Sequence, residues 1–418
     1  MVPLEKFPDY AGRPSGKPLA LQGLRVADFS RLLAGPFCTQ TLGDLGAEVV
    51  KIESFTGDDC RAYVPPALAG EGAFYISTNR NKKSISLDLK HEAGKRIALD
   101  IIRGSDILVE NFSNGVMDRL GFGYEDVKAI NPGIIYCAVS AYGRDDKSVP
   151  ARTGFDAMFQ ASSGFMSLTG EPGRHPMRTT VPVIDAATAM MATNAILGAL
   201  VARERMGFGQ YVEVALFDVA IAMLGFYGLM GIIGDTMPTR LGNRAPLSTP
   251  SDAYETSDGL IFLTAGNDRL FSRLAAEIGR PELASHPDFR ENHLRSRNHA
   301  ALTPVLAEVF STQTTKYWVD KLGKAGIPIA PVNTIGQALE SPDVMKRGIV
   351  SKIPHPAAGS VPTIRSPLRM GGTPVADPAP PPLLGQDTVA VLRDILGYDE
   401  EKLSAALASG AVKAGPAD

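Results

Sequence analysis

The first 140 residues alternate between short apolar strands and helices, and this alternation restricts the fold more than any other feature of the sequence. Strand-like apolar runs occupy residues 24–30, 48–54, 83–89, 106–112 and 133–140. Helical patterns lie between them at 35–47 and 91–102, with Pro36 near the first turn of the former, where a missing N–H does no harm. Strands separated by helices form βαβ units, so we predict an α/β fold with a Rossmann-like sheet.

Ligands of such sheets bind beyond the carboxyl ends of the strands, so the residues that follow each strand are the first candidates for a site. Glu53 ends the second strand, as the ribose-binding acid of a dinucleotide site would. The first turn, however, reads RLLAGP (31–36) and lacks the GxGxxG glycines that let a pyrophosphate approach the backbone. The sequence therefore argues against an NAD site.

The length of 418 residues predicts two domains, because a single hydrophobic core stops growing at roughly 250–300 residues. Residues 153–234 are mainly helical in pattern, with one strand at 209–216, and the Gly- and Pro-containing connector 234–252 follows. A second compact unit is then predicted, with strands at 251–256 and 259–266 and helices around 268–279, 299–310 and 315–325. A Pro-rich linker at 373–385 precedes an amphipathic helix over 387–397 and a short helical tail.

Charge and cysteine content exclude several classes of protein. The net charge is −3 and long runs of Lys and Arg are missing, which argues against nucleic acid as a partner. The densest basic cluster, NRNKKS (79–84), suits a small anionic ligand. Cys38, Cys60 and Cys137 are far apart and form no CxxC motif, so neither a disulfide framework nor a zinc site is expected.

Two stretches bear on localisation. Residues 1–18 have no apolar h-region, so no secretory signal is expected. The most membrane-like stretch, 219–234, is short for a membrane span and is interrupted by Gly, which favours a buried helix. We therefore predict a cytoplasmic protein that does not associate with membranes.

Seven stretches in order along the chain resemble the class III CoA-transferases, a family that includes formyl-CoA, carnitine and succinyl-CoA:dicarboxylate CoA-transferases and the related α-methylacyl-CoA racemases. They are DFSRLLAGPFCTQTLGDLGAEVVKIES (28–54), NRNKKSISLDLK (79–90), DILVENFSNGVMDRLGFGYEDV (106–127), GFDAMFQASSGFMSLTGEP (154–172), DGLIFLTAGNDRLF (258–271), GIPIAPVNT (326–334) and PPLLGQDTVAVLRDILGY (381–398). Because they span nearly the whole chain, the resemblance covers both predicted domains.

The resemblance implies a large Rossmann-like domain built from both chain ends, a smaller inserted α+β domain, and two subunits interlocked as a homodimer. On this basis residues 1–233 form the N-terminal part of the large domain, 234–252 a linker, 253–335 the small domain, and 336–418 the return linker and the C-terminal part of the large domain. CoA or acyl-CoA is then a substrate, with no permanently bound cofactor and no metal.

The resemblance also implies a set of CoA contacts. They are Leu32, Ala34, Leu87, Asp88, Leu89, Lys90, Asn111, Phe112, Arg119, Ala141 and Tyr142. Arg119 and Lys90 suit the phosphates, Arg by forked hydrogen bonds and Lys as a point charge. Phe112 and Tyr142 offer faces to adenine or to the pantetheine arm. The alternatives are ordinary ones: solvated surface cations, and aromatic side chains that cap the sheet.

Asp185 lies between the apolar run VPVI (181–184) and a helical stretch of Ala, Met and Leu. By itself this position favours a helix N-cap, because Asp accepts hydrogen bonds from free N–H groups and suits the helix dipole. The resemblance implies instead that Asp185 is the nucleophile, which attacks an acyl-CoA thioester as an already ionised carboxylate and forms an aspartyl anhydride and then an aspartyl-CoA thioester. A desolvated, cap-like setting is compatible with both roles.

Two rival functions remain. A racemase needs a histidine base where this chain has Phe155, which cannot exchange a proton. Asp156 beside it is interpreted as a buried acceptor for backbone N–H groups. A catalytically silent CoA-binding protein is the second rival, and the retained Asp185 argues against it.

The substrate signal comes from the branch of the family. Oxalate is disfavoured because Leu33 replaces the Gln of formyl-CoA:oxalate enzymes and no glycine run lies within 235–300. The small-domain segments most resemble the branch that acts on succinyl-CoA and C4–C5 dicarboxylic acids. Arg174, His175 and Arg178 could pair with a distal carboxylate, although their Gly- and Pro-containing segment favours a mobile surface loop.

Overall fold

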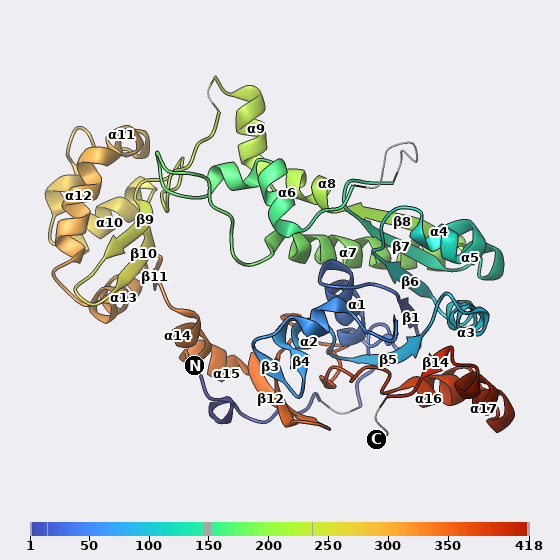
Figure 1. Ribbon diagram of the computed structural model, residues 1–418. Coiled ribbons are helices and arrows are strands. Elements are labelled where there is room, and N and C mark those ends of the chain that lie inside the picture. The colour runs from blue at the N-terminus through green and yellow to red at the C-terminus, as the bar shows by residue number, and fades with distance from the viewer. Residues whose placement is uncertain (1, 15, 145–151, 236, 416–418) are drawn as a thin grey trace. The chain divides into compact units, whose positions relative to one another are not determined.

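A computed structural model of the chain describes residues 2–14, 16–144, 152–235 and 237–415. It comprises two compact units (Figure 1). The larger unit is built from Met1–Ser163, Thr180–Gly225 and Ser341–Asp418, and the smaller from Gly164–Thr179 and Phe226–Glu340. The chain therefore enters the smaller unit at Gly164 and returns to the larger unit at Thr180, before the helix that carries Asp185.

A seven-stranded sheet organises the larger unit, in the order β14-β5-β2-β1-β6-β7-β8. Its strands are β14 (Val412–Lys413), β5 (Lys82–Leu87), β2 (Glu48–Glu53), β1 (Arg25–Asp28), β6 (Ile107–Glu110), β7 (Ile135–Ser140) and β8 (Gln210–Ala215). All neighbours run parallel except β14, which is antiparallel to β5. The predicted α/β fold is confirmed, with a mixed rather than wholly parallel sheet.

Helices cover both faces of this sheet. α3 (Glu92–Arg103) and α5 (Tyr124–Ile130) share a core with Tyr136 and Ala138 of β7. On the opposite face, Cys137 lies near Cys38 of α1 (Ala34–Asp44), and Cys38 is hydrogen-bonded to Thr193 of α7 (Val183–Met206). Because side chains alternate along a strand, α1 and α7 pack together on the face that α3 and α5 leave open.

The connections of the sheet determine where these helices begin. α1 and α7 each follow one parallel strand and precede another, so both run from the carboxyl edge of the sheet to its amino edge. Their first turns therefore lie along the carboxyl edge. α5 connects β6 to β7 and α7 connects β7 to β8, so both connections move the chain in the same direction across the sheet. Because α5 and α7 cover opposite faces of the sheet, the two connections have opposite handedness.

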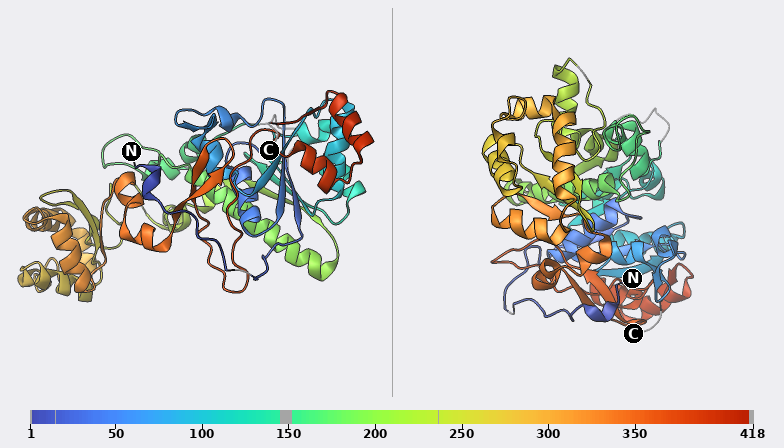
Figure 2. Two further views of the ribbon diagram at one scale, coloured as in Figure 1. Left: turned by 90° about the horizontal axis from the view of Figure 1, so that it is seen from below. Right: turned by 90° about the vertical axis from the view of Figure 1, so that its left-hand side faces the viewer.

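The C-terminal segment returns to the sheet, and both views of Figure 2 show its red helices beside the cyan α3. It contains α16 (Thr388–Ala390), one π-helical turn (Val391–Ile395), α17 (Glu400–Ala408) and β14. Two hairpins also belong to this unit, β3 (Ala67–Leu68) with β4 (Glu71–Gly72) and β12 (Val350–His355) with β13 (Gly359–Ile364). The remaining helices are α2 (Ala73–Thr78), α4 (Val116–Leu120), α6 (Asp156–Ser162), α8 (Leu216–Ala222) and α15 (Pro342–Arg347).

The smaller unit contains an antiparallel sheet, β11 (Ile329–Pro331), β10 (Leu260–Thr264) and β9 (Ser251–Glu255), in that order. Its helices are α9 (Gly225–Ile233, which starts at the boundary), α10 (Asp268–Glu277), α11 (Asn292–Arg297), α12 (His299–Phe310), α13 (Thr315–Lys324) and α14 (Ile335–Leu339). Phe271, Phe310 and Trp318 anchor an apolar core on the sheet. The three helices predicted for this part of the chain are confirmed.

The expectation of one buried helix over 219–234 is wrong. The stretch forms α8 and α9, which are bent by 69°, and Gly225 at the bend has φ +51°. α9 buries no residue, and Ile232 and Ile233 are about four-fifths exposed, at 78% and 82%. Gly225, the first residue of α9, adopts the left-handed backbone at the bend, which glycine does without strain, and none of the described residues buries the apolar side chains of Ile232 and Ile233.

Membrane-span criteria of length and composition are met, within the described residues, by α7 alone or by α7 and the bent pair α8–α9 taken as one span. In α7, 44% of the most apolar window is buried inside the structure. Core helices of globular proteins meet the same criteria, and α7 packs against α1 and the sheet.

Candidate active site

A pocket of about 440 Å³ opens at the carboxyl ends of β1, β2, β5 and β6. Among the predicted CoA contacts, five line it: Leu87, Asp88, Leu89, Lys90 and Phe112. Its other walls come from the loops after β1 and β2, including Phe29, Arg31 and Phe55. The volume is that of a small-molecule site, and it lies where parallel sheets bind ligands.

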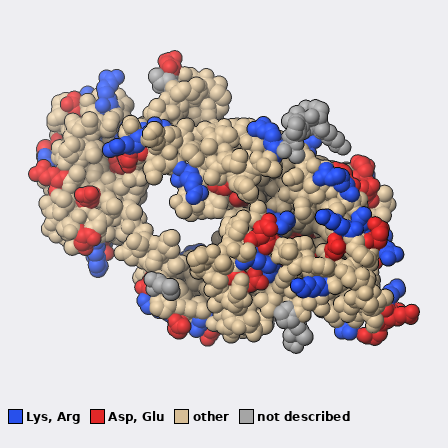
Figure 3. Space-filling view, in the orientation of Figure 1, with Lys and Arg blue, Asp and Glu red and all other residues tan. Residues whose placement is uncertain are grey.

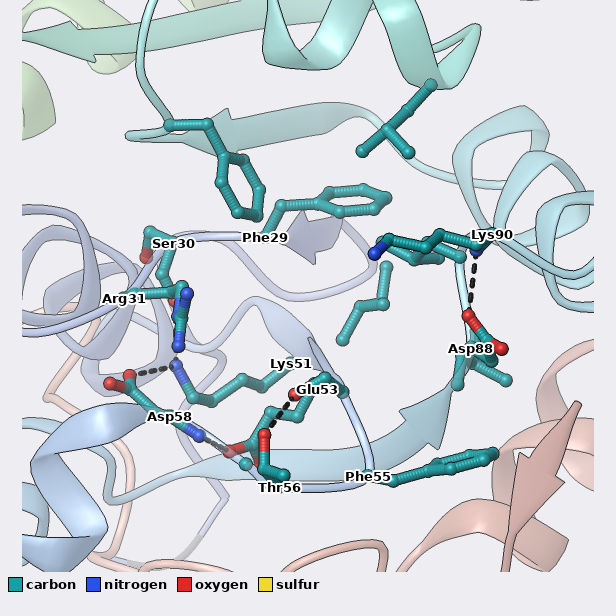
Figure 4. A pocket seen from close by; sticks show the side chains of 17 residues that line it. Phe29, Ser30, Arg31, Lys51, Glu53, Phe55, Thr56, Asp58, Asp88 and Lys90 are labelled. Atoms are coloured by element: carbon teal, nitrogen blue, oxygen red, sulfur yellow. Dashed lines mark hydrogen bonds and ion pairs between the residues drawn. The ribbon is translucent and has the colours of Figure 1, made fainter.

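The pocket combines cations with aromatic faces (Figure 4). The Lys90 side chain extends toward the middle of the pocket, and its ammonium has no hydrogen-bond or ion-pair partner among the described residues. The Lys90 backbone N–H donates to Asp88 Oδ1 at 2.9 Å, which fixes the start of this segment. Phe29 and Phe55 lie on opposite sides of the space in the same view. A phosphate and an aromatic base are the ligand groups that such a lining suits.

The loop after β1 is fixed by hydrogen bonds at successive residues. Asn111 accepts from Arg31 N at 2.8 Å and donates to Arg31 O at 2.7 Å. Leu32 N donates to both oxygens of Asp58, at 3.1 and 3.2 Å. Leu32 has φ +66°, a left-handed conformation that a branched side chain rarely adopts. The surrounding contacts hold this strained backbone in place, as is common at ligand sites.

Two buried ion pairs support that loop from below. Lys51 Nζ donates to Asp58 Oδ2 at 2.9 Å and to Ser30 O at 2.8 Å. Lys82 Nζ donates to Asp28 Oδ2 at 3.0 Å, and all four charged side chains are fully buried. Burial alone would raise the pKa of Asp58, but the charge and hydrogen bond of Lys51 lower it to about 2. These charges are therefore part of the scaffold of the pocket.

Glu53 borders the pocket, but its carboxylate is already occupied. Arg61 donates to Glu53 from Nε at 2.9 Å and from a terminal nitrogen at 2.7 Å, and Ser84 Oγ donates at 2.7 Å. Asp58 N donates to Glu53 Oε1 as well, at 3.0 Å. A ribose hydroxyl would have to displace these donors, so the geometry agrees with the sequence argument against NAD.

The remaining predicted contacts do not line the pocket. Ala34 is buried at the first turn of α1, and Asn111 and Leu32 act through the loop described above. Arg119 is exposed on α4, directly before Leu120 of the pocket wall, and has no side-chain partner among the described residues. Arg119 therefore remains available to a phosphate at the rim.

Phe112 is held by its backbone, and Tyr142 belongs to a different cluster. Phe112 N donates to Glu110 at 2.9 Å, and Arg144 donates to Phe112 O at 2.8 Å. The Tyr142 ring packs against Phe159 and Phe217, with centroids 5.2 and 5.3 Å apart, while Ala141 O accepts from Phe217 N at 3.0 Å. Ala141 and Tyr142 thus support the helices near Asp185 and do not line the pocket.

Asp185 lies in the first turn of α7 but does not cap it. The N-cap position is Pro182, which supplies no side-chain acceptor. Asp156, the first residue of α6, accepts from Ile184 N at 2.8 Å and from Asp185 N at 3.2 Å, and it is itself buried. The interpretation of Asp156 as a buried acceptor is confirmed, and the expectation that Asp185 caps the helix is wrong, because Asp156 takes that position.

The Asp185 carboxylate is left without a donor or a cation among the described residues. Burial, and secondarily the negative charge of Asp156, raise its pKa to about 7. The assumption that this group is fully ionised near neutral pH is therefore corrected, since a pKa of about 7 gives comparable amounts of both forms. Desolvated carboxylates of this kind are rare outside functional sites.

Arg174, His175 and Arg178 lie in the smaller unit, in the segment Gly164–Thr179. All three are exposed and belong to no helix or strand, which agrees with the prediction of a surface loop. Met177 N donates to Thr169 O at 2.9 Å and Gly242 N to Gly170 O at 3.1 Å, so the loop is tied to its own unit. Figure 3 shows basic and acidic side chains interspersed on the face that it displays.

Comparison with known proteins decides between the functions that this geometry allows. The family model "CoA-transferase family III" matches residues 21–388. The chain belongs to that family. It is a family III CoA-transferase, and the resemblance seen in the sequence is confirmed.

Named relatives and a solved structure agree with this assignment. The chain is 35% identical over 409 residues to the succinyl-CoA:glutarate CoA-transferase of Homo sapiens, across 96% of this chain and 93% of the relative. It is 34% identical to the succinate–glutarate CoA-transferase of Agrobacterium fabrum, across 91% and 97%. A crystal structure of a CAIB/BAIF family protein from Brucella suis matches with a TM-score of 0.81 and 35% identity, across 91% of this chain and all of the other.

Several residues that shape the pocket were missed from the sequence: Asp28, Phe29, Arg31, Lys51, Phe55, Asp58 and Lys82. For two of these residues the sequence itself held an indication. Lys51 lies between Val50 and Ile52, and Lys82 lies at the start of a strand that includes Ile85 and Leu87, so both are expected to be buried, and a buried cation requires a partner. The partners Asp58 and Asp28 could not be assigned, because the path of the loop after β2 and the pairing between strands both depend on the fold.

Proposed function

We propose that this CoA-transferase moves CoA from succinyl-CoA to a C4–C5 dicarboxylic acid, with Asp185 as the nucleophile. The relatives named succinyl-CoA:glutarate CoA-transferase and succinate–glutarate CoA-transferase support the substrate class. The observation that carries the mechanism is the Asp185 carboxylate, which is partly buried, has no donor among the described residues, and lies in a helix turn capped by another residue. A carboxylate with this surrounding is a stronger nucleophile than a solvated or hydrogen-bonded one.

The reaction proceeds through four acyl transfers. An Asp185 oxygen attacks the thioester carbonyl of succinyl-CoA, the C–S bond breaks, and a mixed anhydride and CoA thiolate result. The thiolate attacks the aspartyl carbonyl, releases succinate and leaves an aspartyl-CoA thioester. The acceptor carboxylate attacks that thioester, the C–S bond breaks, and a second mixed anhydride and free CoA thiolate result. The thiolate then attacks the acceptor acyl carbonyl of this anhydride, which yields the acceptor acyl-CoA and restores the Asp185 carboxylate.

In the same proposal, CoA occupies the pocket after β1, β2 and β5, with Lys90 and Arg119 toward its phosphates and Phe112 beside its apolar or aromatic parts.

The exposed apolar side chains of α9 support a homodimer, because apolar patches of this kind usually mark an interface. Interlocking of the two subunits, the cytoplasmic location and the predicted domain limits remain part of the proposal. Phe155 is 61% exposed and offers no proton-transfer group, so a racemase is not proposed.

The test is Asp185→Asn, with Asp218→Asn on α8 as a matched control that removes one exposed carboxylate. We expect CoA transfer from succinyl-CoA to glutarate to fall by roughly three orders of magnitude or more in Asp185→Asn, with CoA binding retained. Hydroxylamine with succinyl-CoA should modify the peptide that contains Asp185 in the native chain and the control only. Substantial transfer by Asp185→Asn, after excluding deamidation, would contradict the mechanism.

The substrate class is tested separately. A panel of acyl-CoA donors crossed with mono- and dicarboxylate acceptors, followed by mass spectrometry, should give the highest kcat/KM for succinyl-CoA with a C4–C5 dicarboxylate. Preference for a monocarboxylate acceptor would refute the substrate class and leave the mechanism standing.

A further inference from the structure

Two carboxylates meet at the start of α7, and only one of them is bound by donors. Asp156 Oδ2 accepts from the backbone N–H groups of Ile184 and Asp185, and Gln160 Nε2 donates to Asp156 Oδ1. Three donors converge on Asp156, and none of the described residues donates to the Asp185 side chain.

We propose that Asp156 is a positioning residue for Asp185, which caps α7 in its place and sets the ionisation of the Asp185 carboxylate through its own fixed charge. This inference rests on the proposed nucleophilic role of Asp185. It goes beyond that role, because it assigns to a residue of α6 the control of when the nucleophile is charged.

The capping step follows from the hydrogen bonds. The first N–H groups of a helix need acceptors, and an Asp in the first turn would ordinarily turn back to satisfy them. Asp156 reaches those N–H groups from α6, so Asp185 has no unsatisfied donor of its own turn to bind. Its carboxylate is then free to face a substrate.

The charge step follows from proximity and burial. Asp156 is 7% exposed, and one of its oxygens is 3.2 Å from Asp185 N. It is the one charged group among the described residues that acts on Asp185, whose pKa is raised first by burial and then by this like charge. Neither α1 nor α8, which also pack against α7, brings a charged group to bear on it. A raised pKa accompanies greater nucleophilicity of the ionised form, so Asp156 links positioning to reactivity.

The test compares two neutral caps, Asp156→Asn and Asp156→Ser, with the native chain. Both keep a side-chain acceptor for the N–H groups and remove the charge. We expect the acidic limb of kcat against pH to move to lower pH by about one unit, as loss of a nearby like charge should cause, with KM for succinyl-CoA changed by less than about twofold. Asp218→Asn, which removes a carboxylate that does not act on Asp185, should leave the limb where it is.

Each outcome decides the matter. A lower kcat and melting temperature with an unmoved acidic limb would mean that Asp156 is structural only, and would overturn the proposal. Failure of both neutral caps to fold would also overturn it, because the charge would then serve folding and not Asp185. Loss of the proposed function is recognised independently, by transfer activity that survives in Asp185→Asn.

Discussion

The loop after β1 and the first turn of α7 lie along the same edge of the sheet, yet their charged side chains have opposite surroundings. Beneath the loop, each buried charge faces a counter-charge, Lys51 with Asp58 and Lys82 with Asp28. At the start of α7, Asp185 has no cation or donor among the described residues, and the charge that acts on it has the same sign. Paired charges hold a backbone in place, whereas an unpaired one is kept reactive.

Under the proposed function, this difference separates the scaffold of the pocket from the nucleophile. Asp58, which is paired with Lys51, accepts from Leu32 N and so helps to hold Leu32 in its left-handed conformation. Asp185 instead reduces the stability of the fold whenever it is ionised, because its pKa is raised above the unfolded value. The following changes test that contrast, in order of decreasing effect.

Removal of one member of a buried pair should have the largest effect. Asp58→Ala leaves Lys51 buried without its hydrogen-bonded counter-charge, and we expect the free energy of unfolding to fall by about 3–5 kcal/mol. Asp59→Ala is the matched control, because the neighbouring Asp59 forms an exposed pair with Arg31, and it should cost at most about 1 kcal/mol. Urea denaturation of both variants measures the difference, and equal losses would contradict the scaffold role of Lys51 and Asp58.

Removal of the unpaired charge of Asp185 should instead increase the free energy of unfolding at high pH. The pKa of Asp185 is about 7 in the folded chain, so the native fold loses stability as pH rises from the unfolded value of about 4 through 7. Asp185→Asn should therefore be more stable than the native chain at pH 8, by about 2–4 kcal/mol, and no more stable near pH 4. A helix cap would give the reverse, since its loss destabilises the fold at pH 8.

The smallest effect concerns a cation that faces the pocket. Lys90→Ala should weaken CoA binding about tenfold at low salt, and the loss should shrink at high salt because a phosphate contact is screened. Lys83→Ala is the control, since Lys83 is paired with Glu48 and does not line the pocket. Calorimetry of the two variants checks this, and equal affinities would remove Lys90 from the proposed contacts.

Much of the larger unit could be predicted from local pattern. The predicted strand 48–54 is observed as Glu48–Glu53, and the helix 91–102 as Glu92–Arg103. The β12–β13 hairpin was missed because Pro354 and Pro362 interrupt its pattern, and prolines are depleted within strands. β14 has two residues and exists only through its pairing with β5, which no local pattern contains.

The candidate site, like the fold, could be predicted from the sequence only in part. Asp185 was singled out by its position before a helical stretch and by the family resemblance, and its catalytic role stays a prediction. Asp156 was correctly interpreted as an acceptor for backbone N–H groups. That Asp156 caps the helix of Asp185 depends on how α6 packs against α7, so the sequence assigned the cap to the wrong carboxylate. The pairing of Lys51 with Asp58 likewise required the fold, because the two residues are joined through the loop after β2.

The most direct measurement is the ionisation of Asp185 itself. Carbon NMR of the native chain labelled at the aspartate carboxyl carbons, with Asp185→Asn to assign the signal, follows this one group through a pH titration. The account predicts a midpoint near pH 7, the value to which burial and Asp156 raise the pKa. A midpoint near 4, the ordinary value of an exposed aspartate, would show that Asp185 is solvated or hydrogen-bonded, and would contradict the account.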